Sequence, residues 1–304
     1  MSSFAHTLPT RFRLSALPRF HLLMVFSSIS LLVISFIGCR LTSTTIPDVG
    51  SIAIGVVLLI PIILLIPLFW HEKGKMNLRD AALTIPWCIF FKVALPCSIA
   101  IAGRLGMNIA LQDDNFIRLD HTLGIDIPTV TAYASHHWLG NCINSTYTLL
   151  FPLLHAAFLA PALTGQVKKA QQFIVSNLLM FIFCVPMFGF FPAVGPWYGF
   201  HLAASPAQLT CQQSLLSLRT PGPYSLLLYG VICFPSFHVI WTIVCANALW
   251  CYKLLRIPLV ILSTLIILST MTAGWHYFID VLAGLVLAAI IVTLTQALCH
   301  WHTP

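Results

Sequence analysis

The chain has 304 residues, of which 59% are hydrophobic and only 8% are charged, whereas about a quarter of the residues in soluble domains are charged. This composition excludes a water-soluble globule and predicts a single membrane domain over residues 1–304. The formal net charge of +7 does not indicate nucleic-acid binding, because the basic residues lie in short loops between apolar runs, where they set membrane topology.

Apolar runs suited to a hydrocarbon core about 30 Å thick recur along the chain. They predict membrane-spanning helices near residues 20–39, 51–70, 81–103, 143–163, 173–190, 236–251, 254–274 and 278–298. The first run is interpreted as a retained helix, since no convincing small-residue cleavage site marks it as a cleaved signal. The expected fold class is therefore an all-α polytopic membrane protein, a bundle of about eight transmembrane helices.

The distribution of basic residues predicts which side of the membrane each loop faces. Threading the chain alternately through the bilayer places ten basic residues on one side and four on the other, so the richer side is cytoplasmic and holds both termini. The opposite side holds the long segments 104–142 and 191–235 and the turn at Trp275. Long loops of a compact bundle often carry function. We therefore expect an active site on this side, which is periplasmic for a bacterial inner-membrane protein and otherwise lumenal.

Two short motifs stand where predicted spans begin. Phe234-Pro235-Ser236-Phe237-His238 opens the sixth span, where a serine is an ordinary helix cap and a histidine can simply sit at the membrane interface. In the second motif, just before the eighth span, His276 and Asp280 stand four residues apart and share a helix face. The carboxylate would fix the tautomer of His276 and free its other nitrogen for attack. The alternative is a polar pair that satisfies itself, although an acidic residue within a span usually marks function.

The predicted topology brings the two histidines to the same membrane face. The sixth span runs inward, the turn from Lys253 to Arg256 reverses the chain, and the seventh span returns it to the outer face before His276. Two histidines, one with a carboxylate partner, suit phosphoryl transfer, because one attacks phosphorus and the other, His238, protonates the departing alkoxide. Neither role needs a metal. The sequence predicts no metal site and no cofactor, since the ten cysteines show no paired spacing.

The order and spacing of Pro235-Ser236-x-His238 and His276-x-x-x-Asp280 resemble the second and third signature motifs of the type-2 phosphatidate phosphatase superfamily. The resemblance implies that His276 is the nucleophile and forms a phosphohistidine, that Asp280 orients it, and that His238 is the general acid. Ser236 would help to hold the phosphate, assisted by amide groups at the helix start. The resemblance covers mainly residues 190–285, the expected catalytic region, with weaker support from residues 120–124.

Three departures from the superfamily pattern concern phosphate binding. Thr270 stands where the common third motif has an arginine, Phe237 replaces the glycine of the second motif, and no good first motif is present. These features are similar to the branch that contains the inositol phosphoceramide synthases. Arg219 is then the predicted replacement phosphate ligand, because a guanidinium can grip two phosphate oxygens. The alternatives are a solvated or headgroup-anchoring role for Arg219, and Lys92 as the ligand unless its side chain only snorkels to the interface.

The expected function is that of a membrane lipid phosphatase with its site at the outer face. Transfer of the phosphoryl-bearing headgroup to an alcohol or lipid acceptor is the alternative, and the same histidines serve both. A proton-relaying transporter and a non-catalytic homologue rank lower. Expected partners are the lipid phosphate and membrane lipids, with no nucleic acid. Trp197 and Tyr198 could line a substrate entry path, although interfacial aromatic residues are also common in membrane belts.

Overall fold

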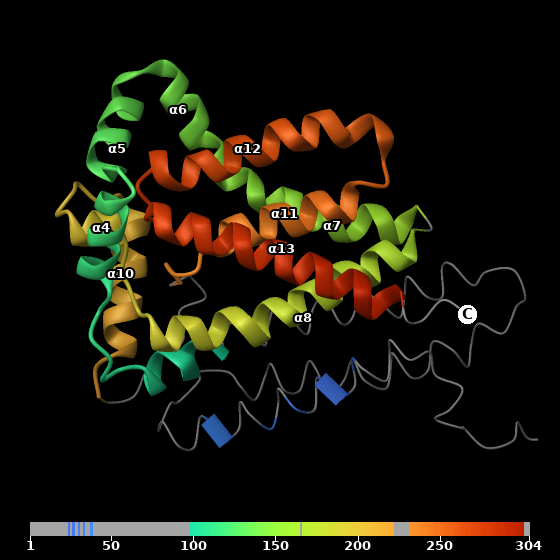
Figure 1. Ribbon diagram of the computed structural model, residues 1–304, viewed down its shortest axis with the longest axis horizontal. Coiled ribbons are helices and arrows are strands. Elements are labelled where there is room, and N and C mark those ends of the chain that lie inside the picture. The colour runs from blue at the N-terminus through green and yellow to red at the C-terminus, as the bar shows by residue number, and fades with distance from the viewer. Residues whose placement is uncertain are drawn as a thin grey trace, which may run out of the picture.

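The computed structural model describes residues 98–164, 166–221 and 232–300, together with a few isolated positions between 24 and 38. Within these ranges the chain is helical and contains no strand, which confirms the all-α fold (Figure 1). The elements are α4 (Asp113–Thr122), α5 (Ile127–His136), α6 (Trp138–Ser145), η2 (Thr146–Leu149), α7 (Leu150–Leu163), α8 (Val167–Phe190), α9 (Pro196–Gly199), α10 (Pro206–Leu218), α11 (Phe237–Leu249), η3 (Lys253–Leu255), α12 (Arg256–Thr272) and α13 (Phe278–His300).

Among the residues that the structure describes, four helical stretches are long and apolar enough to cross a membrane, and α11 is a shorter apolar helix. The four stretches are Trp138–Leu163, Val167–Phe190, Lys253–Thr272 and Phe278–Cys299. Together with α11 they correspond to the last five predicted spans. The predicted span near 51–70, most of those near 20–39 and 81–103, and with them Lys92, lie outside the described residues. The count of eight spans therefore stays a prediction.

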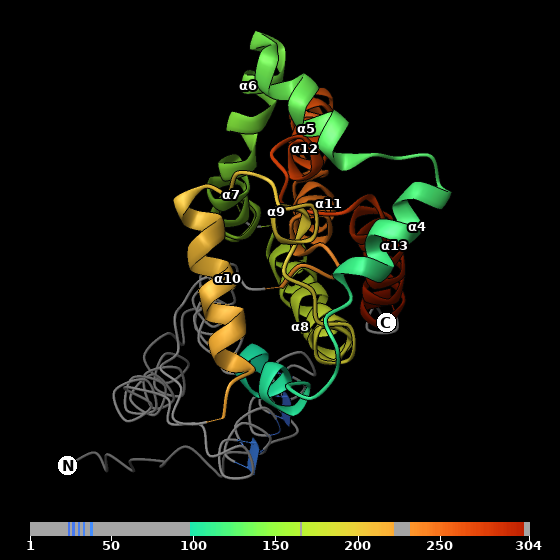
Figure 2. The same ribbon diagram turned by 90° about the vertical axis from the view of Figure 1, so that its left-hand side faces the viewer.

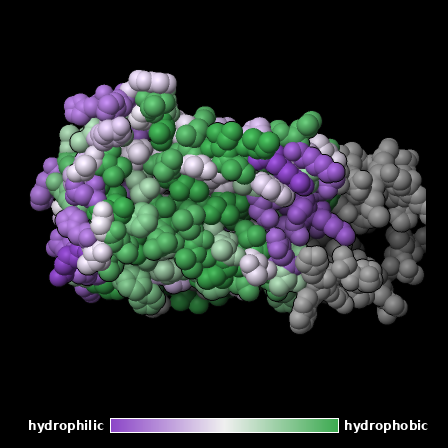
Figure 3. Space-filling view, turned by 45° about the horizontal axis from the view of Figure 1, so that its top comes forward, coloured by the Kyte–Doolittle hydropathy of each residue, from purple (hydrophilic) through white to green (hydrophobic). Residues whose placement is uncertain are grey.

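Helix α11 occupies the centre of the bundle, where it packs against α7, α8, α12 and α13 (Figure 1). Most of its apolar side chains, among them Val239, Ile240 and Val244, are buried between these neighbours, and such packing holds helices together where lipid removes the hydrophobic driving force. The outer helices expose large apolar side chains instead, as Ile257 and Ile261 of α12 do at 74% and 56%. Figure 3 shows the result on one face of the molecule, a broad apolar belt between two hydrophilic ends.

Helices α4, α5 and α10 gather at one end of the bundle, the end at which α13 begins (Figure 2). Capping residues in the local sequence fix where two of these helices, α10 and α5, begin. Ser205 and Gln208 form a reciprocal capping box at the start of α10, and the Asp126 side chain accepts from the Thr129 N–H at the start of α5. This end of the bundle carries both motifs identified in the sequence.

Candidate active site

The turn between α12 and α13 positions His276. The Thr270 carbonyl accepts hydrogen bonds from the N–H groups of Trp275 and His276 over 2.9 and 3.0 Å, which ends α12 in a tight turn. Gly274 has a φ of +69° in this turn, a conformation that glycine adopts without strain. From α10, the Gln208 amide donates to the Ala273 and Gly274 carbonyls, both over 3.3 Å. The turn is therefore held from both helices.

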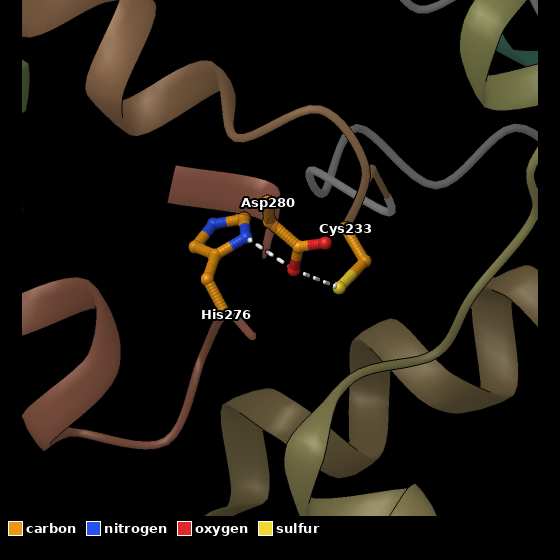
Figure 4. A group of neighbouring side chains, drawn as sticks. All are labelled: Cys233, His276 and Asp280. Atoms are coloured by element: carbon orange, nitrogen blue, oxygen red, sulfur yellow. Dashed lines mark hydrogen bonds and ion pairs between the residues drawn. The ribbon is translucent and has the colours of Figure 1, made fainter. Parts of the chain in front are cut away.

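His276 and Asp280 face each other as the sequence predicts. Nδ1 of His276 lies 3.4 Å from Oδ2 of Asp280, and the two side chains are only 4% and 0% exposed (Figure 4). The same carboxylate oxygen accepts from the Cys233 thiol over 3.0 Å and from the Tyr277 N–H over 2.9 Å. Burial raises the pKa of the Cys233 thiol, so Cys233 is a neutral donor to this carboxylate. Because Asp280 faces Nδ1, the nitrogen left for chemistry is Nε2.

His238 lies in the first turn of α11, and its ring centroid is 6.1 Å from that of His276. The Tyr147 ring stacks on the His238 ring at 3.9 Å, and the Tyr147 hydroxyl is 3.3 Å from His238 Nδ1. On its other side Tyr147 stacks on Trp275 at 5.1 Å. The other ring nitrogen of His238, Nε2, is buried and has no hydrogen-bond partner among the described residues. Tyr147 thus holds His238 by one nitrogen and leaves the second available.

A cavity of about 90 Å³ lies beside the two histidines. Since about 10–15 Å³ of such space holds one water molecule, this cavity has room for a group the size of a phosphate. Its described lining contains no lysine or arginine. The lining residues are Ile99, Tyr147, Val194, Trp197, Cys211, Leu215, Ile232, Cys233, Phe237, His238, Trp241, Trp275 and His276.

Of the two aromatic residues predicted to line an entry path, only Trp197 reaches the cavity. It is buried, lies edge-to-face with Trp275 at 5.5 Å, and donates through its indole N–H to Gln212 over 3.2 Å. Tyr198 is partly buried and packs against the hydrophobic core. Trp197 is thus part of the site wall, whereas Tyr198 is not among the lining residues.

The two predicted phosphate ligands make other interactions. Ser236 is fully buried, and its hydroxyl accepts from the Val239 N–H over 3.4 Å as the cap of α11. The Arg219 guanidinium, at the C-terminal end of α10, donates to the backbone carbonyls of Gly106, over 3.1 Å, and Ile109. Neither residue lines the cavity. Thr270, at the position of the missing arginine, donates its hydroxyl to the Ile267 carbonyl of its own helix.

Two buried carboxylates that the sequence analysis did not single out as site residues support the site from α4. Asp120 accepts from the N–H groups of Phe278 and Ile279 over 2.8 and 2.9 Å and thereby caps α13. Asp113 accepts from the N–H groups of Val194 and Gly195 and from the Tyr277 hydroxyl. Burial raises the pKa of both carboxyl groups despite these hydrogen bonds.

The sequence contained a signal that could have identified the two buried carboxylates of α4. Asp113, Phe116 and Asp120 are its buried residues, and their spacing of three and four is that of one helix face. Two acidic residues on a buried face require partners, and here the partners are the backbone N–H groups that lead into the site. Tyr147 and Cys233 had no comparable signal, since an isolated tyrosine or cysteine in an apolar run looks like any packed side chain.

One group of described residues could hold a metal ion. Single ligand atoms of Cys233, His276 and Asp280 all lie within 4.8 Å of one another. Figure 4 shows the three side chains converging, with the imidazole and the thiol on either side of the carboxylate.

Apolar helices long enough to cross a membrane surround two histidines and a carboxylate beside a cavity, an arrangement that suits a membrane phosphatase-type enzyme. The sequence profile of the PAP2 superfamily matches residues 114–294, more than half of the chain, and the chain therefore belongs to this superfamily. No curated protein and no solved structure matches the chain. The match confirms the superfamily resemblance of the two motifs, while the inositol phosphoceramide synthase-like branch stays a prediction.

Proposed function

We propose that this chain is an integral membrane lipid phosphatase in which Nε2 of His276 attacks the phosphorus of a lipid phosphate ester. The observation that carries the proposal is the 3.4 Å approach of His276 Nδ1 to Asp280, beside a cavity that His238 also lines. The carboxylate would keep the proton of His276 on Nδ1, so that Nε2 presents its lone pair. As the nitrogen–phosphorus bond forms, the bond from phosphorus to the lipid oxygen breaks.

His238 would act as the general acid in this step. In its protonated form, Nδ1–H would donate to the Tyr147 hydroxyl. Nε2, which has no partner among the described residues, would protonate the departing oxygen of an ester bound in the cavity that His238 lines. The neutral His238 that remains keeps its proton on Nδ1, because Tyr147 accepts it. Its Nε2 can then accept a proton from the water that attacks the phosphohistidine. Tyr147 would therefore keep the proton of His238 on Nδ1, as Asp280 does for His276.

The phosphate in this proposal lies at the start of α11. Backbone N–H groups and the helix dipole favour an anion there, and a protonated His238 adds positive charge. Arg219 is not part of the proposed binding site, since its guanidinium donates to Gly106 and Ile109. The site would face the periplasm or a lumen, with both termini in the cytoplasm, as the basic residues of the loops predict.

A lipid headgroup phosphotransferase is the second candidate. The observation that favours it is the aromatic wall of the cavity, which includes Trp197, Trp241 and Trp275. An apolar wall limits the water around a phosphohistidine, and an alcohol that binds against the aromatic faces would then compete with water as acceptor. The first half of the reaction is the same for both candidates.

The test is phosphate release and lipid product formation by the purified full chain in detergent, with chelator, over a panel of lipid phosphates with and without alcohol acceptors. We expect activity that His276→Ala abolishes, while alanine at the exposed His136 leaves it unchanged. A labelled phosphoprotein that is acid-labile and base-stable should accumulate on rapid quenching. Wild-type protein that neither releases nor transfers phosphate from any substrate would refute the proposal.

A further inference from the structure

The buried group of Cys233, His276 and Asp280 contains polar atoms that no described residue satisfies. Nδ1 of His276 and Oδ1 of Asp280 are buried and have no hydrogen-bond partner among the described residues, although Nδ1 lies 3.4 Å from the other carboxylate oxygen. Buried polar atoms of this kind are rare in folded proteins and often mark the position of an ion or a water molecule. Both atoms lie in the group shown in Figure 4.

The three side chains also form a chemically consistent set. Thiolate, imidazole and carboxylate are the ligands that Zn²⁺ takes from proteins. They come from three segments, namely the loop before α11, the turn before α13 and the first turn of α13. Cys233 and His276 also line the cavity, so the group lies next to a space large enough for an ion and for a water molecule as the fourth ligand.

We propose that Cys233, His276 and Asp280 bind one zinc-class divalent ion, and that the bound ion inhibits the phosphatase. Zinc bonds of about 2.0–2.3 Å around a tetrahedral centre separate ligand atoms by about 3.4–3.6 Å. The 3.4 Å between Nδ1 and Oδ2 fits, and Nδ1 and Sγ, which lie within 4.8 Å of each other on either side of the carboxylate, are drawn together by the ion. The 3.0 Å between Sγ and Oδ2 must lengthen, and loss of the thiol proton to solvent has that effect, because thiolate and carboxylate repel each other.

Inhibition follows from the two nitrogens of His276, and this half of the inference rests on the proposed function. A neutral imidazole that binds a metal through Nδ1 carries its proton on Nε2. Metal binding therefore moves the proton of His276 from Nδ1 to Nε2 and removes the lone pair that attacks phosphorus. The ion also takes the Asp280 oxygen that orients the ring. A metal at this position would hold the inactive tautomer of the nucleophile.

Direct binding is tested by titration of Co²⁺ into the metal-free full chain in detergent. We expect one equivalent per chain, a thiolate-to-cobalt charge-transfer absorption, and its loss when Zn²⁺ is added. Cys233→Ala should remove this absorption, and His276→Ala should weaken binding as a second ligand variant. Cys211→Ala is the matched control, because Cys211 lines the same cavity without belonging to the group, and it should keep the absorption. No charge-transfer band in the wild type, or a band that survives Cys233→Ala, would overturn the proposal.

Phosphate release then measures the inhibition. Zn²⁺ should inhibit the wild type, and its half-inhibiting concentration should rise at least about tenfold in Cys233→Ala relative to that variant's own metal-free rate. We expect a rise of at least this size because loss of a group that merely orients a metal ligand already weakens metal affinity by about 10- to 100-fold. Zn²⁺ inhibition that persists unchanged in Cys233→Ala would overturn the inhibitory role. If the protein binds metal but has no activity, the metal site is supported and the proposed phosphatase function is refuted. If it is active but binds no metal, the phosphatase function is supported and the metal site is refuted.

Discussion

The backbone N–H of Ser236 donates to the backbone carbonyl of Asp280 over 3.2 Å. This bond ties the start of α11 to the first turn of α13. Gly284, one turn further along α13, permits the close approach, since a Cβ there would lie 3.0 Å from both the Ser236 oxygen and the Val239 Cβ. The two motifs are thus joined through their backbones, and the separation of His238 and His276 is fixed by helix packing.

Replacement of Asp280 by asparagine tests the orienting role of the carboxylate. An amide fits the same space and its oxygen can still accept from Tyr277, but it carries no negative charge to stabilise the imidazolium that forms when Nε2 bonds to phosphorus. We expect kcat to fall by about 10²–10⁴ while the protein stays folded. Steady-state phosphate release and thermal unfolding measure the two effects. The exposed acid Asp114 of α4, changed to asparagine, is the control, and a wild-type kcat in Asp280→Asn would contradict the proposed mechanism.

Tyr147→Phe tests whether the tyrosine hydroxyl supports the general acid. The stacking of the ring on His238 survives, but the partner of Nδ1 is lost, so the protonated imidazole is less stabilised. We expect a lower kcat and a basic limb of the pH–rate profile that moves to lower pH. A purely packing role would leave the position of that limb unchanged. Tyr252→Phe is the control, because its hydroxyl bonds to Thr164 at the far end of α11.

Substitution of Arg219 tests whether this residue binds phosphate, as the sequence predicts, or stabilises the fold through its observed hydrogen bonds to the backbone. Because its guanidinium donates to two backbone carbonyls, Arg219→Ala should lower the free energy of unfolding by about 1–3 kcal/mol and leave KM within about twofold. A large loss of kcat/KM with unchanged stability would instead support the predicted role as a phosphate ligand. The exposed Arg118, changed to alanine, shows the effect of removing a positive charge alone.

The pH dependence of stability tests the burial of Asp120. Burial raises the pKa of this carboxyl above its ordinary value of 3.8. Its contribution to folding stability is therefore fully present below pH 3.8 and is lost as pH rises through the raised value. The unfolding temperature of the wild type minus that of Asp120→Asn should increase as pH falls from neutral toward 4. A difference that stays constant or shrinks would contradict the raised pKa.

The local sequence patterns predicted the helices and the pairing inside one motif. Apolar runs predicted the last five spans because a helix in lipid must satisfy its backbone internally and present apolar side chains outward. The spacing of His276 and Asp280 predicted their approach because residues four apart lie on one helix face. The shared membrane face of His238 and His276 followed from counting the helices between them.

Only the tertiary structure decided which side chains surround these motifs. The sequence predicts Arg219 and Ser236 as phosphate ligands, and the structure adds that Arg219 donates to the Gly106 and Ile109 carbonyls and that the Ser236 hydroxyl caps α11. The structure also identifies Tyr147, Asp120 and Cys233 as residues that contact the two motifs. A residue's partner within a helix is set by a fixed period, but its partner across the bundle depends on how helices pack and on which buried polar atoms still need hydrogen bonds. That information is not local in the sequence.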